Sequence, residues 1–219
     1  MSCRIISIEG NIGSGKSTLV EELKQRIKDP NVVFCQEPVD VWNEIKETNT
    51  GTTILSRFYE DPTKYAFAFQ MMAYISRISM LRKLIKENPG AIIITERSVE
   101  TDRNVFAKML RDQKHINELQ YKIYLQWFDE FSENTKVSSV IYVKTSTNMC
   151  MERILKRNRE GESIHKSYLE ECSQYHDNWL KNCNNVLSLN GDVQLDDNVA
   201  NEWVRTIQQH IQEQKIQHQ

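Results

Sequence analysis

The chain has 219 residues, which is enough for one domain with a sizeable core. Charged residues make up 26% of it and the formal net charge is −2, so a large basic footprint for nucleic acid is not expected. The five cysteines contain no CxxC pair, and their odd number excludes a complete disulfide framework, which favours reduced thiols over structural zinc. No apolar run reaches the length of a membrane span, so we expect no membrane contact and a cytoplasmic location, with a processed organellar form left open.

Short apolar runs rich in β-branched residues alternate with amphipathic helical patterns along the chain. Five runs have the length and composition of strands buried on both faces, at residues 4–8, 32–35, 91–95, 140–143 and 186–189. Helices are predicted after Ser17, from Pro62 to about Ile85, after Ser98, and over 116–131, 148–157, 167–180 and 199–211. This alternation predicts a single α/β domain over residues 1–219, with a parallel sheet covered by helices on both faces. The Gln/His-rich tail, residues 212–219, is expected to be frayed.

The first strand runs into a glycine-rich loop. Residues 10–17 read GNIGSGKS and fit the motif G-x-x-x-x-G-K-[ST], with a strand before it and a helical pattern after it. Backbone N–H groups of such a loop surround phosphate oxygens, and the following helix N-terminus adds positive potential. We expect Lys16 to reach the β- and γ-phosphates and Ser17 to bind Mg²⁺. The predicted site for ATP or another nucleoside triphosphate comprises Gly10, Asn11, Ile12, Gly13, Ser14, Gly15, Lys16, Ser17 and Thr18.

Two large classes of P-loop protein fit the sequence poorly. The N-K-x-D motif of Ras-type GTPases does not occur, and the third apolar run ends in Glu96 and Arg97, not in the aspartate common in motors and transporters. Phosphoryl transfer needs an acid that binds metal, an acid that orients the nucleophile, and cations around the transferred group. The chain offers candidates for all three.

Several motifs then follow in a characteristic order. They are EPVDVW at 37–42, FQ at 69–70, SR at 76–77, ERSV at 96–99 with DR at 102–103, and KRNREGE at 156–162. In order and spacing the chain from about residue 5 to 197 resembles the deoxyribonucleoside kinases of the deoxycytidine, deoxyguanosine and insect type. The resemblance implies a P-loop kinase fold with a five-stranded parallel sheet and an arginine-rich lid at about 153–165.

The resemblance also implies catalytic roles. Glu37 follows the second strand at the ligand-binding edge of the sheet, where its carboxylate can accept the proton of a 5′-hydroxyl. Glu96 joins Ser17 in holding Mg²⁺. Arg97 donates to Glu37 and to the 5′-oxygen and, with Lys16, stabilises charge on the transferring phosphoryl group. A structural ion pair is the alternative for Glu96 and Arg97.

Residues for the nucleoside come from the long helix and its neighbours. Gln70 can hydrogen-bond a nucleobase through its amide, and Phe69 and Phe106 offer faces for stacking, with plain core as their alternative role. Tyr59 and Glu162 are expected at the sugar 3′-hydroxyl. The remaining predicted substrate residue is Trp42.

A basic run near residue 155 resembles the lid of the family. Arg153, Arg157 and Arg159 are expected to close over the phosphates, although a solvated basic helix end is the usual meaning of such a run. Asp192, after the last strand, is expected beside the base of the donor.

Arg77 and Asp102 bear on which nucleoside is used. Thymidine-preferring members of the family carry uncharged Met and Ala at these positions, whereas deoxycytidine and deoxyguanosine kinases carry Arg and Asp. An Asp–Arg pair suits a base with an exocyclic amine and is poorly matched to the thymine methyl group. We therefore expect deoxycytidine or a purine deoxynucleoside as substrate, with thymidine weak. Arg103 receives no role.

Two other functions remain open at this point. A nucleoside monophosphate kinase of the thymidylate kinase type would share the fold, but would need basic residues for an acceptor phosphate where this chain has Glu37 and Glu162. A non-catalytic nucleotide-binding module is the second alternative. A homodimer formed through helices is expected from the family resemblance.

Overall fold

Five parallel strands form the centre of the molecule. The computed structural model describes residues 3–159 and 161–216. The sheet has the order β2-β3-β1-β4-β5, and every neighbouring pair is parallel. The strands are β1 (Arg4–Glu9), β2 (Val32–Cys35), β3 (Ile92–Glu96), β4 (Ser139–Lys144) and β5 (Val186–Asn190). All five predicted strands are confirmed, each to within one residue at either end.

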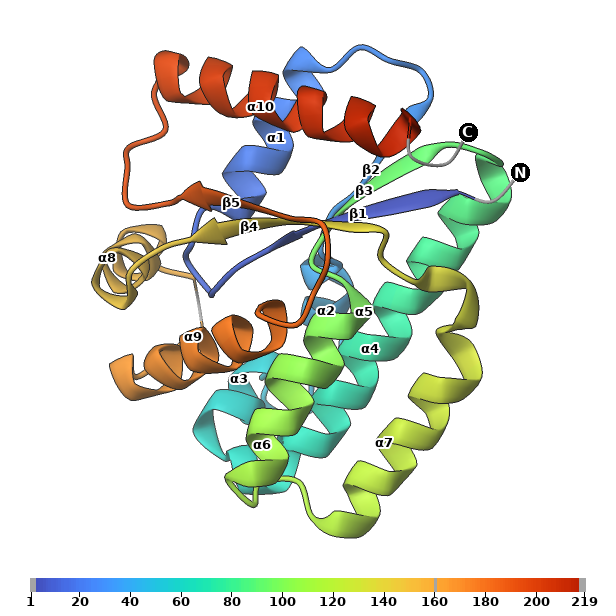
Figure 1. Cartoon of the computed structure of the whole chain (residues 1–219). Helices are drawn as coiled ribbons and strands as arrows, with labels where there is room; N and C mark the ends of the chain where they lie inside the picture. The colour runs from blue at the N-terminus through green and yellow to red at the C-terminus, as the bar shows by residue number, and fades with distance from the viewer. Residues whose placement is uncertain (1–2, 160, 217–219) are drawn as a thin grey trace.

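Helices cover both faces of this sheet (Figure 1). On one face, α1 (Lys16–Arg26) and α10 (Asp197–Ile216) pack with Ile6 and Ile8 of β1 in a shared core. The other face and the end of the sheet carry α2 (Val39–Glu44), α3 (Ile54–Glu60), α4 (Pro62–Glu87), α5 (Val99–Thr101), the π-helix η1 (Asp102–Ala107), α6 (Lys108–Asp112), α7 (Glu118–Phe131), the 3₁₀ turn η2 (Glu133–Thr135), α8 (Thr147–Arg157) and α9 (Lys166–Leu180).

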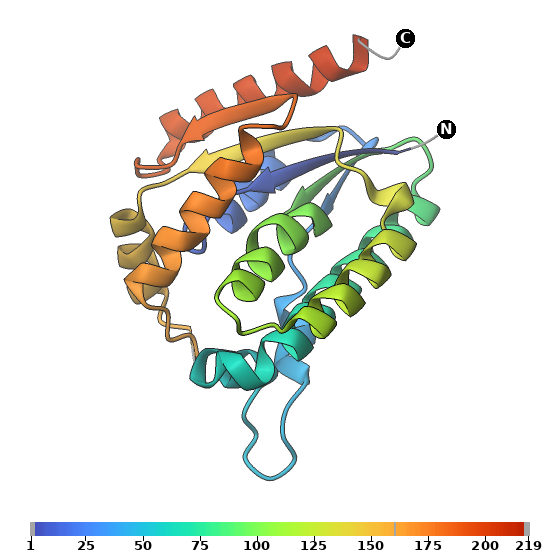
Figure 2. The same ribbon diagram turned by 60° about the horizontal axis from the view of Figure 1, so that its bottom comes forward.

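Local sequence signals set several of these boundaries. Pro62 occupies the first turn of α4, as predicted, and the Asp61 side chain caps the helix by accepting from the Lys64 N–H at 3.1 Å. The short helices α2 and α3 were not predicted, because neither is long enough to show a clear apolar period. The loop between them projects from the body and is closed by a bridge between Lys46 and Thr53 (Figure 2).

The last helix enters the tail that the sequence analysis expected to be frayed from residue 212. Helix α10 continues to Ile216, and its Ile207 and Ile211 are buried against the sheet, which supports the last turns. Residues 217–219 lie outside the described part of the chain. Two further observations complete the fold: the five cysteines are free thiols, and no helix in 3–159 or 161–216 is long and apolar enough to cross a bilayer.

The strand order decides where a site can form. Strand β1 is central, with β3 on one side and β4 on the other. Ligands of open parallel sheets bind beyond the carboxyl ends of the strands, where the order along the chain reverses. The glycine-rich loop after β1, Glu37 after β2 and Arg97 after β3 therefore come together at this edge.

Candidate active site

A cavity of about 1010 Å³ opens at the carboxyl edge of the sheet, and residues 12–18 form one wall of it. Helix α1 begins at Lys16, after Gly15 in the left-handed conformation with φ 101°. The Lys16 Nζ is held at the loop by the Asn11 carbonyl at 2.6 Å and the Ser14 Oγ at 3.4 Å. Burial, with Arg97 adding to it, lowers the pKa of Lys16 to about 7. Phosphate oxygens at this wall would favour the charged form again.

Two residues of the loop make contacts with other helices: Gly13 through close packing and Asn11 through hydrogen bonds. A β-carbon on Gly13 would lie 2.5 Å from the Cys150 carbonyl oxygen of α8, and its φ of +78° also favours glycine. The Asn11 side chain points away from the cavity and donates to the Leu169 carbonyl and to the Ser173 Oγ, both at 2.7 Å. The Asn11 side chain is thus used within the protein, so only its backbone could take part in a phosphate site, which the motif by itself did not indicate.

Ser17 and Glu96 meet, as their predicted shared role requires. The Ser17 Oγ donates to the Glu96 Oε1 at 2.5 Å. A hydroxyl and a carboxylate are the hard oxygen donors that Mg²⁺ accepts, usually together with water and substrate phosphates. No cluster of three or more His, Cys, Asp or Glu suited to a metal occurs among the described residues.

Glu37 and Arg97 face each other across the cavity floor. The Arg97 Nη1 donates to both carboxylate oxygens of Glu37, at 3.0 and 2.9 Å, and its Nε has no partner among the described residues. Burial would raise the pKa of Glu37, but Arg97, Arg77 and Lys16 outweigh it and lower that pKa to about 2. Glu37 is therefore a carboxylate at neutral pH. The Arg97 guanidinium also lies over the Phe106 ring, 5.2 Å from its centroid.

Arg77 joins two groups that the sequence analysis kept apart. Its Nε donates to Asp102 Oδ2 at 2.9 Å, its Nη2 to Glu37 Oε1 at 2.9 Å, and its Nη1 to the Glu96 carbonyl at 3.0 Å. The predicted Arg77–Asp102 pair is present, but Arg77 is not reserved for the base: it also holds the carboxylate of Glu37. Burial, partly offset by Arg77, raises the pKa of Asp102 to about 6.

An aromatic wall with one free amide forms the deeper end of the cavity. The Gln70 side chain is buried, and its Oε1 has no hydrogen-bond partner in the described structure, so a ligand could supply one. Phe69 both lines the cavity and stacks on Phe58 at 4.8 Å, so its two expected roles, core and ligand wall, coexist. The predicted Trp42, Tyr59 and Phe106 line the same cavity.

The family comparison agrees with this geometry. The family model of deoxynucleoside kinases matches residues 6–214. The chain belongs to the deoxynucleoside kinase family. It is 36% identical to a probable deoxycytidine kinase of Fowlpox virus, over 85% of this chain and 78% of that one. It is 37% identical to deoxycytidine kinase 2 of Gallus gallus, over 81% and 74%, and 31% identical to the mitochondrial deoxyguanosine kinase of Xenopus laevis, over 82% and 74%.

Membership makes the chain a nucleoside kinase, a phosphotransferase that uses a nucleoside triphosphate donor. It does not favour the thymidylate kinase type or the non-catalytic module. The individual residue roles still rest on the geometry.

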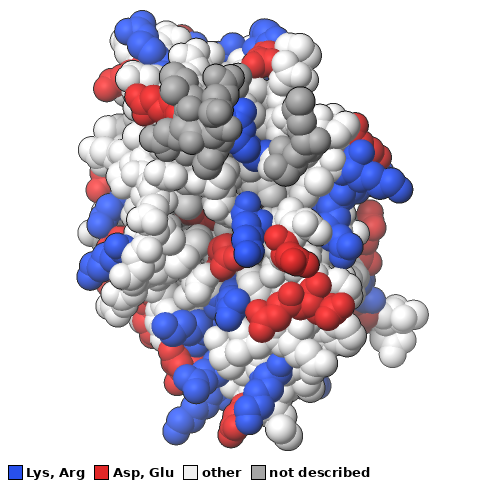
Figure 3. All heavy atoms as spheres, turned by 45° about the vertical axis from the view of Figure 1, so that its right-hand side comes forward, with Lys and Arg blue, Asp and Glu red and all other residues white. Residues whose placement is uncertain are grey.

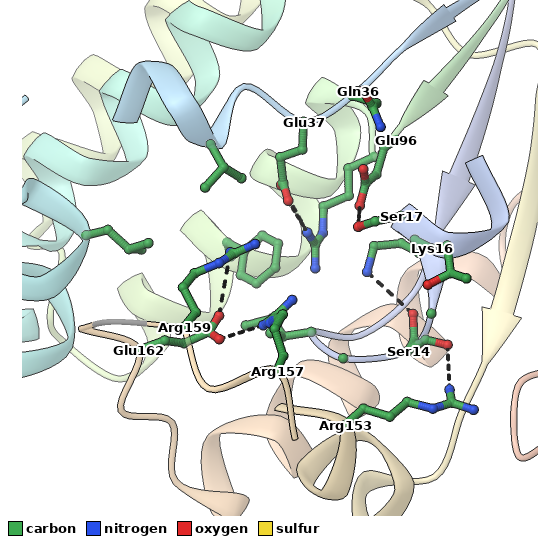
Figure 4. A pocket seen from close by; sticks show the side chains of 18 of the residues that line it. Ser14, Lys16, Ser17, Gln36, Glu37, Glu96, Arg153, Arg157, Arg159 and Glu162 are labelled. Carbon is green, nitrogen blue, oxygen red and sulfur yellow. Dashed lines mark hydrogen bonds and ion pairs between the residues drawn. The ribbon is translucent and has the colours of Figure 1, made fainter. Parts of the chain in front are cut away.

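The segment predicted as a lid approaches the cavity from α8. Glu162 accepts from the Arg157 Nη2 at 2.5 Å and lies 3.8 Å from the Arg159 Nη1. Figure 4 shows these three side chains turned toward the space beside Lys16, whereas Arg153 points to Ser14 of the glycine-rich loop. Glu162 is thus an ion-pair partner of Arg157 and Arg159, a contact that was not expected from the sequence.

Arg153 has a different environment from the other two arginines. It donates to three carbonyl oxygens, those of Ser14 at 3.0 Å, Gly191 at 3.0 Å and Val193 at 2.7 Å. Arg153 therefore fastens the loop after β5 to the phosphate loop, and it lines the cavity from there. Residue 160, within the predicted lid, lies outside the described part of the chain.

The structure does not bring Asp192 to the cavity. Its carboxylate accepts from the Ser146 N–H at 2.8 Å, just before α8. The next three residues, 193–195, line the cavity instead. The loop after β5 therefore borders the cavity through these residues, whereas the Asp192 side chain is used in a contact within the protein. Arg103, left without a role, pairs with Asp129 at 3.3 Å and faces α7.

Proposed function

We propose that this kinase transfers the γ-phosphoryl group of ATP to the 5′-hydroxyl of a deoxyribonucleoside, and that it favours deoxycytidine or purine deoxynucleosides over thymidine. The observation that carries the proposal is the contact between Glu37 and Arg97 in a cavity that the glycine-rich loop and Gln70 also line. An acid and a cation at this point suit an acceptor hydroxyl, whereas an acceptor phosphate would meet the negative charge of Glu37.

Glu37 would orient the 5′-hydroxyl and receive its proton. A pKa of about 2 makes Glu37 a weak base in the ground state. Phosphoryl transfer asks little of a base until the new P–O bond forms, because the transition state is loose and the proton becomes acidic late. The main task of Glu37 is then to hold the attacking oxygen in line, which is worth more to the rate than basicity.

Cations around the transferred group would stabilise its charge. Lys16 would bind the β- and γ-phosphates, and Arg97 could donate to the 5′-oxygen through the Nε that lacks a protein partner. Arg157 and Arg159 would exchange part of their contact with Glu162 for phosphate oxygens. Mg²⁺, held by Ser17 and Glu96, would neutralise charge on the phosphates when bound.

Base selection would rest on Gln70 and Asp102. The free Gln70 amide can hydrogen-bond a base edge, and Asp102 can accept from an exocyclic amine of cytosine, adenine or guanine. Thymine presents O4 and a methyl group there, so Asp102 would receive no hydrogen bond from the base and would keep only its contact with Arg77. Arg77 would hold the Asp102 carboxylate in place, so its part in base selection would not be limited to a contact with the base.

We also propose that two copies associate through α7 and the adjoining side of α4. Four apolar residues are spaced four apart on α7: Leu119, Ile123, Trp127 and Phe131. The first three of them are 72%, 45% and 43% exposed, in that order. Ile75 of α4 is a further exposed apolar residue, at 48%. An apolar stripe of this kind supports a second copy as the partner. Figure 3 turns the α7 side toward the viewer and shows charges of both signs set among broad uncharged areas.

The choice of acceptor tests the proposed chemistry. ADP formation would be measured with ATP, Mg²⁺ and either a deoxynucleoside or its 5′-monophosphate. We expect turnover with the nucleoside and little with the monophosphate. Turnover restricted to the monophosphate would contradict the assignment of Glu37, and no acceptor-dependent turnover would favour a binding module.

A further inference from the structure

Arg97 has a backbone conformation that is unusual for its residue type. Its φ is +60°, in the left-handed region that residues with a β-carbon rarely adopt. Such a conformation persists where the surroundings over-determine it, and it is common at functional sites. The contacts that hold Arg97 there therefore also decide where its guanidinium points.

Two of these contacts come from β1 and from β3, the strand that Arg97 directly follows. The Arg97 N–H donates to the Ile8 carbonyl at 3.0 Å, and the Thr95 Oγ1 donates to the Arg97 carbonyl at 2.8 Å. They fix the residue on the side of β3, but they leave the following turn into α5 unconstrained.

A buried carboxylate fixes that turn. Glu9, the last residue of β1, accepts from the Ser98 Oγ at 2.6 Å through Oε1 and from the Thr101 Oγ1 through Oε2. The Ser98 Oγ also accepts from the Thr101 N–H at 3.3 Å and so caps α5. Ser98 at the start of α5 and Thr101 at its end are thus both tied to β1, the strand that ends directly before Gly10.

Glu9 is a costly residue to keep in this place. Its exposure is 0%, and no Lys, Arg or His of the described residues forms an ion pair with it. A buried carboxylate without an ion pair is unfavourable unless hydrogen bonds or function compensate it. Glu9 accepts the two hydroxyls through two different carboxylate oxygens, and a neutral amide, with one oxygen and one NH2 group, could not accept at both.

We propose that Glu9 is a positioning residue of the kinase reaction: by accepting from Ser98 and Thr101 it holds the left-handed turn at Arg97, and so aims the Arg97 guanidinium at Glu37 and the acceptor oxygen. The inference rests on the proposed role of Arg97. In this role Glu9 links β1, which precedes the phosphate loop, to Arg97, so the phosphate loop and the Arg97 guanidinium keep their relative position.

Steady-state kinetics of four variants test this inference. Glu9→Gln and Ser98→Ala should lower kcat by about 10-fold or more, with dissociation constants for nucleoside and ATP changed less than about threefold, because ground-state binding does not depend on the aim of Arg97. Ser98→Thr, which keeps the hydroxyl, should retain kcat. Ser7→Ala is the matched control, since Ser7 is buried two residues away on β1 and its Oγ has no partner among the described residues.

A double-mutant cycle separates positioning from general destabilisation. In an Arg97→Lys background, Glu9→Gln should change kcat by less than about threefold, because the guanidinium it positions is gone. An equal loss in both backgrounds, or full kcat in Glu9→Gln, would overturn the inference. If Glu9→Gln does not fold, the Ser98→Ala and Ser98→Thr pair carries the same decision in both backgrounds. Normal kcat in Arg97→Lys alone would instead contradict the proposed role of Arg97.

Discussion

Arg77 donates to Glu37 through Nη2 at 2.9 Å, and this contact ties the middle of α4 to the carboxylate at the reacting group. The same guanidinium holds Asp102, on the base side of the cavity, through Nε. If Glu37 and Asp102 have the proposed roles, substrate choice and catalysis share one side chain. A change at Arg77 should alter both, whereas a change at Asp102 should act mainly on the base.

This sharing gives a prediction on specificity. Replacing both charges with Arg77→Met and Asp102→Ala should raise the kcat/KM for thymidine relative to deoxycytidine by about tenfold or more, because the mismatch with the thymine methyl group is removed. The absolute kcat should fall with every nucleoside, since Glu37 loses a partner. Competition between the two nucleosides measures the ratio. Arg103→Met is the matched control, because Arg103 follows Asp102 but faces α7; an unchanged ratio in the double variant would refute the assignment.

Glu37 should matter for turnover and little for the donor. Glu37→Gln keeps the shape of the side chain but removes its charge, so kcat should fall by about 100-fold or more, the usual scale for a positioned base. ATP binding, measured by calorimetry, should stay within a few-fold of the parent. Glu44→Gln, at an exposed position on nearby α2, should leave both quantities unchanged. Near-normal turnover of Glu37→Gln would remove Glu37 from the role.

Lys16 should take up a proton when the triphosphate binds. Its pKa in the free protein is about 7, so at pH 8 most molecules carry a neutral amine, which the phosphates will protonate. The binding enthalpy at pH 8 should therefore vary with the ionisation enthalpy of the buffer. In Lys16→Arg, whose side chain stays charged, that dependence should be lost. Equal enthalpies across buffers for the parent protein would contradict the prediction.

The lowered pKa of Lys16 also predicts how the free energy of unfolding changes with pH. In the unfolded chain the pKa of Lys16 is near 10.5, the usual value for lysine, so between pH 7 and pH 10.5 the unfolded state binds more protons than the folded one. The Lys16 contribution to the unfolding free energy of the ligand-free protein should therefore rise with pH across this window and be lost as pH falls to 7. Comparison of urea unfolding for the parent and Lys16→Met across this range measures it; parallel pH profiles would argue against it.

The exposed stripe on α7 predicts the oligomeric state. Ile123→Glu with Trp127→Glu should convert a dimer to a monomer in sedimentation velocity, because two buried charges per copy would oppose the apolar contact. Leu155→Glu, which changes another exposed apolar residue on α8, should leave the dimer intact. A monomeric parent protein would contradict the proposed association.

The main candidate site residues could be predicted from the sequence because a parallel sheet gathers them. The motif after β1, Glu37 after β2 and Arg97 after β3 each follow a strand, and the carboxyl ends of parallel strands share an edge. Their meeting therefore follows from strand order rather than from side-chain detail. The five strands could be predicted for a related reason, since buried β-branched runs are distinctive.

Other contacts could not be predicted, because they depend on rotations and loop paths. Whether Arg77 reaches Glu37 as well as Asp102 is decided by how α4 turns against the sheet. Likewise, Asn11 and Asp192 have the right chemistry for a ligand, but each side chain is used within the protein. The contact of Glu162 with Arg157 depends on the path of the lid segment, for which spacing alone gives no direction.

The most direct measurement is kcat/KM for deoxycytidine, deoxyadenosine, deoxyguanosine and thymidine, each with ATP and Mg²⁺ under the same conditions. The Arg77–Asp102 pair and the free Gln70 amide predict that a nucleoside with an exocyclic amine gives the highest value and thymidine a low one. The highest value for thymidine would contradict the account of how this site selects its substrate.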